Sequence, residues 1–225
     1  MREPINVSGM VLSASPVGEY DKRVVILTRE LGKITAFARG ARRMKSPLMA
    51  VSNPFVFGEF QVYEGRDSYT LSGANIKEYF LDLAQMQPGV YYGFYFLELA
   101  EYFGQEGNDE TQMLNLLYVT MNAIRSGKQD LRLIRCIFEL RTITISGEAP
   151  QMFSCMECGT KENLTVFSLR DSAIYCPNCG KTIRDPWPLQ PGTVLACRYI
   201  IAAPLAKLYG FTVNEEILDE LERLL

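Results

Sequence analysis

Hydrophobic positions in the first 77 residues form short segments that are either nearly all apolar or alternate with polar residues. Glycine, proline or acidic turn residues separate these segments, which is typical of β-strands joined by tight turns. The expected strands cover residues 9–17, 22–30, 31–40, 55–65 and 67–76. The second and third of these meet at Glu30-Leu31-Gly32, and a turn around these residues predicts a hairpin. Five short strands in about 75 residues suggest a small closed or half-closed barrel.

After residue 77 the hydrophobic positions recur with the period of a helix. Asp109 with Gln112 resembles a capping box, and Asp130 is a plausible cap for the next segment. Gly104 and Gly127 are placed to end helices. The expected helical segments are 88–104, 108–127, 130–147, 191–210 and 214–225.

The two patterns predict an α+β multidomain chain. A strand-rich domain is expected over residues 1–78, and a helical domain over 79–225 with an inserted cysteine-bearing segment at 152–184. Charge divides in the same way: residues 1–80 carry 11 cations and 8 acids, whereas the remainder carries 12 and 18. The first domain is therefore basic, although the net charge of the whole chain is −3.

Several function classes lack the residues they need. The chain has no histidine, which removes Ser-His-Asp and Cys-His catalysis and every His-ligated metal site. It has no phosphate-cradling or dinucleotide-binding glycine motif. No run approaches ~18 apolar residues, and no signal peptide is recognised, so we expect a cytoplasmic protein without a membrane span. In a reducing compartment, cysteines more often bind metal than form disulfides.

Four of the six cysteines have the spacing of a metal site. Cys155 and Cys158 form one C-x-x-C pair, and Cys176 and Cys179 form a second pair 17 residues later. Each pair is followed by glycine, and the residues between the pairs alternate as in a small hairpin. Four thiolates in two such turns predict one structural Zn²⁺ ion.

A catalytic zinc is the alternative at these cysteines. The zinc deaminases place Cys or His, then Glu, before Pro-Cys-x-x-Cys. Here Tyr175, not proline, precedes Cys176, and Cys158 supplies a fourth sulfur that would leave no position for water. The remaining cysteines, Cys136 and Cys197, lie in apolar helical segments and are expected in the core.

The positive charge of the first domain is concentrated in residues 22–45, where Glu30 is the only acid. In 33–39, strict alternation places Phe37 on one face with Lys33 and Arg39. Charge for phosphates and a ring for base stacking are what single-stranded nucleic acid requires. The candidate DNA-binding residues are Lys22, Arg23, Lys33, Phe37, Arg39, Arg42, Arg43 and Lys45. The alternatives are a merely solvated charged face and a Phe37 buried in the barrel.

The whole chain resembles the RecO family of bacterial DNA repair and recombination-mediator proteins. The resemblance rests on G-x-V-L…G-E-Y-D at 9–21, LTRELGKITAFARGARR at 27–43 and C-x-x-C-G…C-P-x-C-G at 155–180. It implies that the N-terminal domain is an oligonucleotide-binding (OB-fold) barrel. It also implies a protein that binds single- and double-stranded DNA and anneals complementary strands.

The resemblance further implies protein partners and no small-molecule substrate. With RecR, such proteins help to load RecA onto DNA coated by single-strand-binding protein, and they contact the acidic C-terminal tail of that protein. A basic series among the helical residues could receive such a tail. Its members are Arg125, Lys128, Arg132, Arg135 and Arg141. The favoured alternative for this series is a solvated helix face with internal ion pairs to Asp130 and Glu139.

Other readings of the whole chain stay open at this point. A barrel with a zinc ribbon also suits an RNA-binding or transcription-associated protein. A zinc deaminase would be an enzyme, whereas the mediator is not. A fourth reading, in which zinc only staples a protein-interaction domain, is compatible with the mediator.

Overall fold

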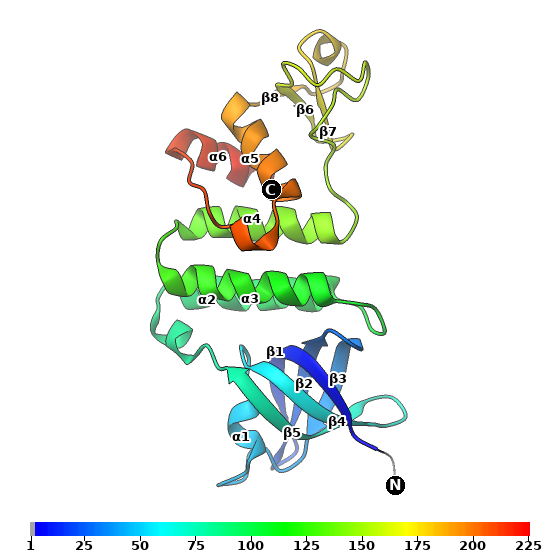
Figure 1. The fold of residues 1–225 in the computed structure, drawn as a ribbon, viewed down its shortest axis with the longest axis vertical. Coiled ribbons are helices and arrows are strands. Elements are labelled where there is room, and N and C mark those ends of the chain that lie inside the picture. The colour runs from blue at the N-terminus through cyan, green and yellow to red at the C-terminus, as the bar shows by residue number, and fades with distance from the viewer. Residues whose placement is uncertain (1–2) are drawn as a thin grey trace. The chain divides into compact units, whose positions relative to one another are not determined.

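The computed structural model describes residues 3–225 and divides into two compact units, one ending at Ser126 and one spanning Gly127–Leu225. The first unit contains all the strands of the expected barrel together with helices α2 (Gly89–Phe103) and α3 (Thr111–Ser126). The second contains the remaining helices and the cysteine segment. The expected boundary near residue 78 separates strands from helices, whereas the contacts group two helices with the barrel (Figure 1).

A closed five-stranded barrel forms the core of the first unit, as the segment pattern predicts. Its strand order is β1-β2-β3-β5-β4, with β3 and β5 parallel and the other pairs antiparallel. This is the closed Greek-key arrangement of the OB-fold. The strands are β1 (Ile5–Val17), β2 (Asp21–Thr28), β3 (Gly32–Ala38), β4 (Phe57–Glu64) and β5 (Tyr69–Glu78).

Alternating side chains fill the barrel. Ile34, Ala36 and Ala38 of β3 point into the core, where Phe60 of β4 is completely buried. The expected β2–β3 hairpin is confirmed, because Thr28 pairs with Gly32 across the turn. A short helix, α1 (Leu48–Val51), connects β3 to β4 and was not evident from the sequence pattern.

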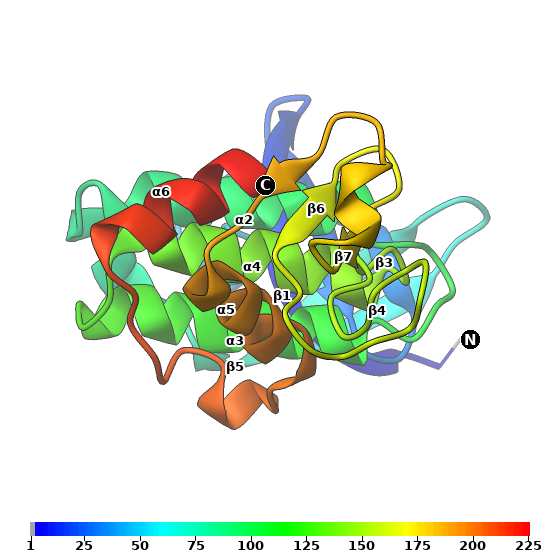
Figure 2. The same cartoon turned by 90° about the horizontal axis from the view of Figure 1, so that it is seen from above.

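Helices α2 and α3 pack on each other and on β1 and β2 of the barrel (Figures 1 and 2). Gly104 ends α2, as expected, and the carboxylate of Asp109 accepts a hydrogen bond from the Thr111 amide at the start of α3. The α2–α3 connection returns to the barrel, where Gly32 and Glu106 form an antiparallel bridge. The connection therefore covers the beginning of β3.

Three helices form the body of the second unit: α4 (Leu131–Ile145), α5 (Pro191–Ala202) and α6 (Glu215–Leu224). They pack pairwise on one another (Figure 2). Asp130 caps α4 as predicted, since its carboxylate accepts a bond from the Arg132 amide. The single helix expected over 191–210 is wrong: α5 ends at Ala202, because Pro204 lacks the amide that would continue it.

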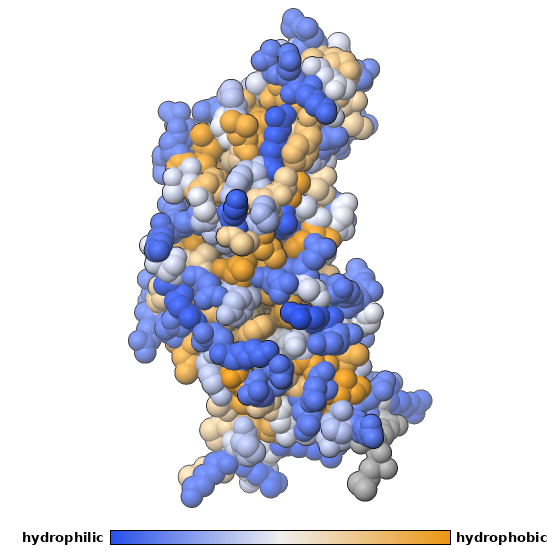
Figure 3. Space-filling view, viewed as in Figure 1, coloured by the Kyte–Doolittle hydropathy of each residue, from blue (hydrophilic) through white to orange (hydrophobic). Residues whose placement is uncertain are grey.

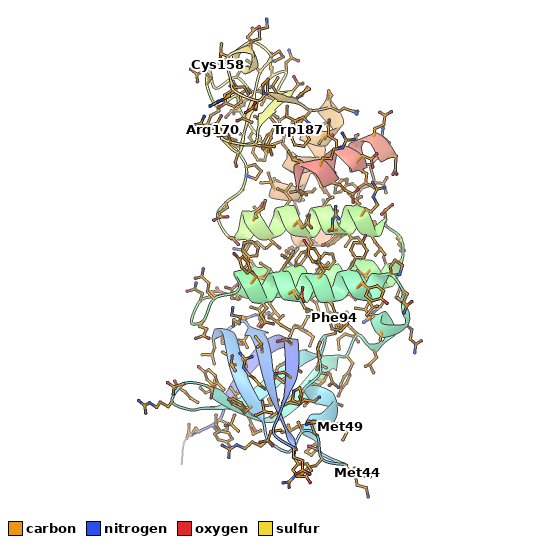
Figure 4. All side chains as sticks on the ribbon, turned by 180° about the vertical axis from the view of Figure 1, so that it is seen from behind. Met44, Met49, Phe94, Cys158, Arg170 and Trp187 are labelled. Carbon is orange, nitrogen blue, oxygen red and sulfur yellow. The ribbon has the colours of Figure 1, made fainter. Side chains whose placement is uncertain are left out.

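The cysteine segment forms its own small sheet. Strands β6 (Val166–Ser168) and β7 (Ala173–Tyr175) make the expected hairpin, and β8 (Trp187–Pro188) joins on the other side of β6. Figure 4 shows Cys158 at the end of this sheet away from the helices of its unit, with Trp187 nearer to them.

Candidate nucleic-acid interface and metal centre

Arg23 and Phe37 face each other across strands β2 and β3. Arg23 is exposed and Phe37 is half-buried, while the residues on either side of Phe37 point into the barrel. The predicted alternation is therefore confirmed, and Phe37 lies on the outer face of the sheet with Lys33 and Thr35. A cation and an aromatic ring stand directly side by side on this face.

A groove of about 590 Å³ runs over this outer face and is closed on one side by the β4–β5 turn. Its cations are Arg23, Lys33 and Arg66, and its aromatic side chains are Phe37 and Tyr69. Three acids share the lining, namely Glu64, Asp67 and Glu106. Burial and the charges of Glu64 and Glu106 raise the pKa of Tyr69, so its hydroxyl stays protonated at neutral pH. Arg66 and Tyr69 were missed by the sequence analysis because they lie about 30 residues from the basic cluster.

The loop after β3 carries the exposed cations Arg39, Arg42, Arg43 and Lys45. Its conformation is fixed at Gly40, which has φ of +68° and donates its amide to the Asp21 carboxylate at 2.7 Å. The Arg42 guanidinium donates to the Gly18 carbonyl at 3.1 Å. In Figure 3 hydrophilic side chains gather at the lower end of the barrel. The loop thus presents ordered positive charge to solvent.

Tyr20 is an aromatic residue of this surface that the sequence analysis did not select. The Arg43 guanidinium lies over its ring, 4.8 Å from the centroid, and the ring remains 42% exposed. Met44, at the tip of the same loop, is 89% exposed (Figure 4). Tyr20 lies in the G-E-Y-D turn between β1 and β2. Local spacing does not predict that this turn meets the loop after β3, so the sequence alone offered little reason to select Tyr20.

Two of the seven candidate cations have their ammonium groups bound within the protein. The Lys33 Nζ atom donates to the Glu101 carbonyl of α2 at 2.6 Å. The Lys22 Nζ atom donates to the Asn53 side chain at 2.7 Å, and burial together with the Arg42 charge lowers its pKa. The structure therefore brings Arg23, Phe37 and the 39–45 loop together on the surface and turns Lys22 and Lys33 toward their own unit.

The four predicted metal ligands, Cys155, Cys158, Cys176 and Cys179, converge. Their Sγ atoms all lie within 4.8 Å of one another, and those of Cys158 and Cys176 are 3.9 Å apart. A tetrahedral ion with sulfur ligands at about 2.3 Å has sulfurs about 3.8 Å from each other. The donor set therefore fits one metal ion.

Backbone amides in the two turns stabilise the thiolate forms of Cys155 and Cys176. Burial raises the pKa of Cys155, but hydrogen bonds from neighbouring amides outweigh it and bring the pKa to about 6. Backbone amides likewise lower the pKa of Cys176. A hydrogen bond with Cys176 raises the pKa of Cys179 to about 12, so the cluster without metal retains protons that a bound cation would displace.

The five cations predicted to receive an acidic tail are distributed over both units, with Arg125 in the first and the other four in the second. Arg125 pairs with Glu78 and Asp82. Arg132 pairs with three carboxylates of α6, Arg135 pairs with Glu139 and Glu222, and Arg141 donates to backbone carbonyls of α5. Lys128 is exposed. The Arg135–Glu139 pair matches one internal ion pair of the favoured alternative.

Comparison with known proteins agrees with this architecture. Family models described as "Recombination protein O N terminal" and "Recombination protein O C terminal" match residues 1–80 and 89–225. The chain belongs to the RecO family. A protein of Alkaliphilus metalliredigens named DNA repair protein RecO is 32% identical over 98% of this chain and 90% of its own length.

Two further relatives carry the same name. The Bacillus pumilus protein is 30% identical over 98% of this chain and 86% of its own length. The Acetivibrio thermocellus protein is 28% identical over 98% and 88%. RecO membership assigns this chain to DNA repair and recombination, which is the role that the sequence resemblance predicts. Within residues 3–225, no helix has the length and apolar character needed to cross a bilayer.

Proposed function

We propose that this RecO-family chain is a non-enzymatic recombination mediator that binds single- and double-stranded DNA through the barrel and anneals complementary strands. The observation that carries the proposal is the cross-strand pair of Arg23 and Phe37, which lines a groove on a strand that continues directly into the exposed cationic loop 39–45. Backbone charge with an aromatic platform binds DNA without reading its sequence, which annealing requires.

The distribution of charge suggests how a strand lies on this surface. Phosphates are repelled from the part of the groove lined by Glu64, Asp67 and Glu106. A base can stack on Phe37, since the base is uncharged and the acids do not repel it. The backbone then follows Arg23 and the exposed cations of the loop. Tyr20, held under Arg43, offers a second ring at that end.

The mediator role also involves proteins. In this proposal the chain acts in the bacterial cytoplasm, at the nucleoid, and cooperates with RecR to load RecA onto DNA coated by single-strand-binding protein. It needs no small-molecule substrate. Family membership supports these steps, and the barrel surface supplies the DNA contact they share.

The acidic tail of single-strand-binding protein is proposed to bind the basic series that includes Arg132 and Arg135. These guanidinium groups already contact carboxylates of α6, so a tail has to compete with Glu215, Asp219 and Glu222. Binding of a labelled tail peptide should therefore strengthen when α6 is weakened. No change in a variant with Glu222 replaced by Gln would count against this location.

The cysteine cluster is proposed to hold one Zn²⁺ ion with a structural role. Cys155, Cys158, Cys176 and Cys179 would bind it, and the ion would staple the two turns. Four sulfur ligands complete a tetrahedron and leave no position for a reacting water, which favours the non-enzymatic reading over a deaminase.

Fluorescence anisotropy on a labelled single strand of about 30 nucleotides, across a salt series, tests the DNA interface. The variant is Arg39→Glu/Arg42→Glu/Arg43→Glu, and the matched control is Lys161→Glu/Arg184→Glu/Arg223→Glu, three exposed cations of the second unit. We expect tight binding at low salt, a log–log slope of about −0.7 per phosphate contacted, and collapse only in the first variant. Equal binding by both folded variants would reject the interface.

A further inference from the structure

Helix α2 has an unusual outward face. Tyr91, Phe94, Tyr95 and Tyr102 are 63%, 47%, 36% and 81% exposed, and Glu98 is exposed between them. The spacing 91, 95, 98, 102 places these side chains in one line along the helix. The opposite face is buried against its own unit through residues such as Phe96, Leu97 and Ala100. We call Tyr91, Phe94, Tyr95, Glu98 and Tyr102 the aromatic strip.

A solvated helix face is normally made of charged and amide side chains, whereas large exposed aromatic patches mark interaction sites. Two rings of the strip also pack against neighbouring rings. Phe94 lies edge-on to Phe55 with centroids 4.7 Å apart, and Tyr102 packs on Phe103 at 5.1 Å. Phe94 and the partly exposed Met49 of α1 lie on the same side of the first unit (Figure 4). Rings that are already fixed lose little entropy when a partner binds.

The charge of the strip decides what it can bind. Helix α2 contains two acids, Glu98 and Glu101, and neither lysine nor arginine. Lys33 borders the same hollow as Glu98, Glu101 and Tyr102, but its ammonium is held by the Glu101 carbonyl. This local charge repels phosphates, and hence nucleic acid and anionic lipid. A second copy using the same face would place glutamates of the two strips close together.

We propose that the aromatic strip of α2 is a docking surface for an arginine-rich segment of a partner protein. A guanidinium group stacks on exposed tyrosine rings and pairs with carboxylates, and the strip offers both groups one helical turn apart. The strip differs from the proposed DNA interface in sign of charge and in residues. Lys33 lines both the groove and the hollow beside the strip, but its ammonium is turned to the Glu101 carbonyl.

The test uses two labelled peptides, (Arg-Gly-Gly)₄ and (Lys-Gly-Gly)₄, and the full chain. We expect the arginine peptide to bind more tightly by about threefold or more, because lysine stacks less well on rings. The variant Glu98→Lys/Tyr102→Ser should weaken arginine-peptide binding by about tenfold. The matched control, Glu148→Lys/Tyr63→Ser, makes the same two changes at exposed positions elsewhere and should bind normally.

Several outcomes would overturn the proposal. Equal affinity for the two peptides, or equal loss in variant and control, would show only general attraction to an acidic protein. Absence of binding by either peptide would reject the surface. Self-association in sedimentation velocity that disappears in Glu98→Lys/Tyr102→Ser, without peptide binding, would assign the strip to a second copy of the chain. Binding of the same variant to single-stranded DNA should be unchanged, which separates this test from that of the barrel.

Discussion

Arg132 of α4 is bound to Glu222 of α6 through two nitrogens, with Nε and Nη2 at 2.9 Å and 2.6 Å from the same carboxylate oxygen. Glu215 and Asp219 of α6 contact the same guanidinium. These hydrogen bonds, above all that with Glu222, raise the pKa of Arg132 further. The guanidinium of Arg132 therefore contacts three carboxylates of one ten-residue helix. The buried side chains of that helix are Leu218 and Leu221.

Replacing Arg132 with alanine should loosen α6. A helix this short is marginal by itself, and without the guanidinium Glu215 and Asp219 lose their partner and repel one another, while Glu222 keeps its pair with Arg135. Hydrogen exchange should show faster amide exchange over residues 215–224, with α4 protected as before. Arg223→Ala, an exposed cation on the same helix, serves as the control and should leave exchange unchanged. Normal protection of α6 in Arg132→Ala would mean that the two leucines and the Arg135–Glu222 pair are enough to hold the helix.

Phe37→Ala should weaken single-stranded DNA binding by about tenfold to a hundredfold, the usual effect of removing one stacked base. Duplex binding should change much less, because paired bases are already stacked and only the backbone cations act. Phe37 is half-buried outside the barrel core, so the melting temperature should fall only slightly. Anisotropy with single- and double-stranded probes makes the comparison.

Tyr63→Ala is the control for that variant, since Tyr63 is a partly exposed aromatic of β4 that does not line the groove. It should bind both probes normally. A Phe37→Ala protein that loses single and double strands in the same proportion would show that the ring supports the fold of the surface and does not stack on bases.

Local patterns predicted the barrel and the metal cluster because both depend on short-range spacing. Alternation placed Phe37 outside and Ala36 inside, and two C-x-x-C turns converged as their spacing indicates. Tyr20, Arg66 and Tyr69 were missed because loops distant in sequence bring them to the surface. The contact of Lys33 with Glu101 spans 68 residues, and no local pattern predicts it. Tertiary contacts therefore decide which cations face solvent.

Thiol labelling should separate the six cysteines into two classes. Burial raises the pKa of Cys136 to about 11 and that of Cys197 to about 12, so both remain protonated and unreactive at pH 8. In the metal-bound protein all six should resist iodoacetamide. After chelation the clustered cysteines should react, with Cys179 the slowest of the four because its pKa is raised to about 12, and mass spectrometry of the peptides should identify them. Modification of Cys136 before Cys158 would indicate that chelation unfolds the helices as well.

Loss of the metal should lower stability before it affects DNA. Cys176→Ser removes one of four ligands, and structural zinc sites contribute directly to folding. We expect a lower melting temperature and a metal content well below one ion per chain by mass spectrometry. The folded fraction should bind single-stranded DNA like the wild type, since the proposed interface lies in the other unit. A stable Cys176→Ser protein that fails only to bind DNA would contradict a structural role.

Gly32 couples the β2–β3 turn to the α2–α3 connection, and its replacement tests that coupling. Its φ is +69°, and a Cβ atom there would lie 2.3 Å from the Gln105 carbonyl oxygen. Gly107 has a similar φ of +74° but no atom within 4 Å of such a Cβ. Gly107→Ala should therefore lower the free energy of unfolding, measured in urea, by about 1 kcal/mol, through backbone strain alone. Gly32→Ala should lower the free energy of unfolding by about 1–3 kcal/mol more than that, because the α2–α3 connection must also move away from the new Cβ atom. Equal losses would show that the connection is free to shift, and that the start of β3 does not depend on it.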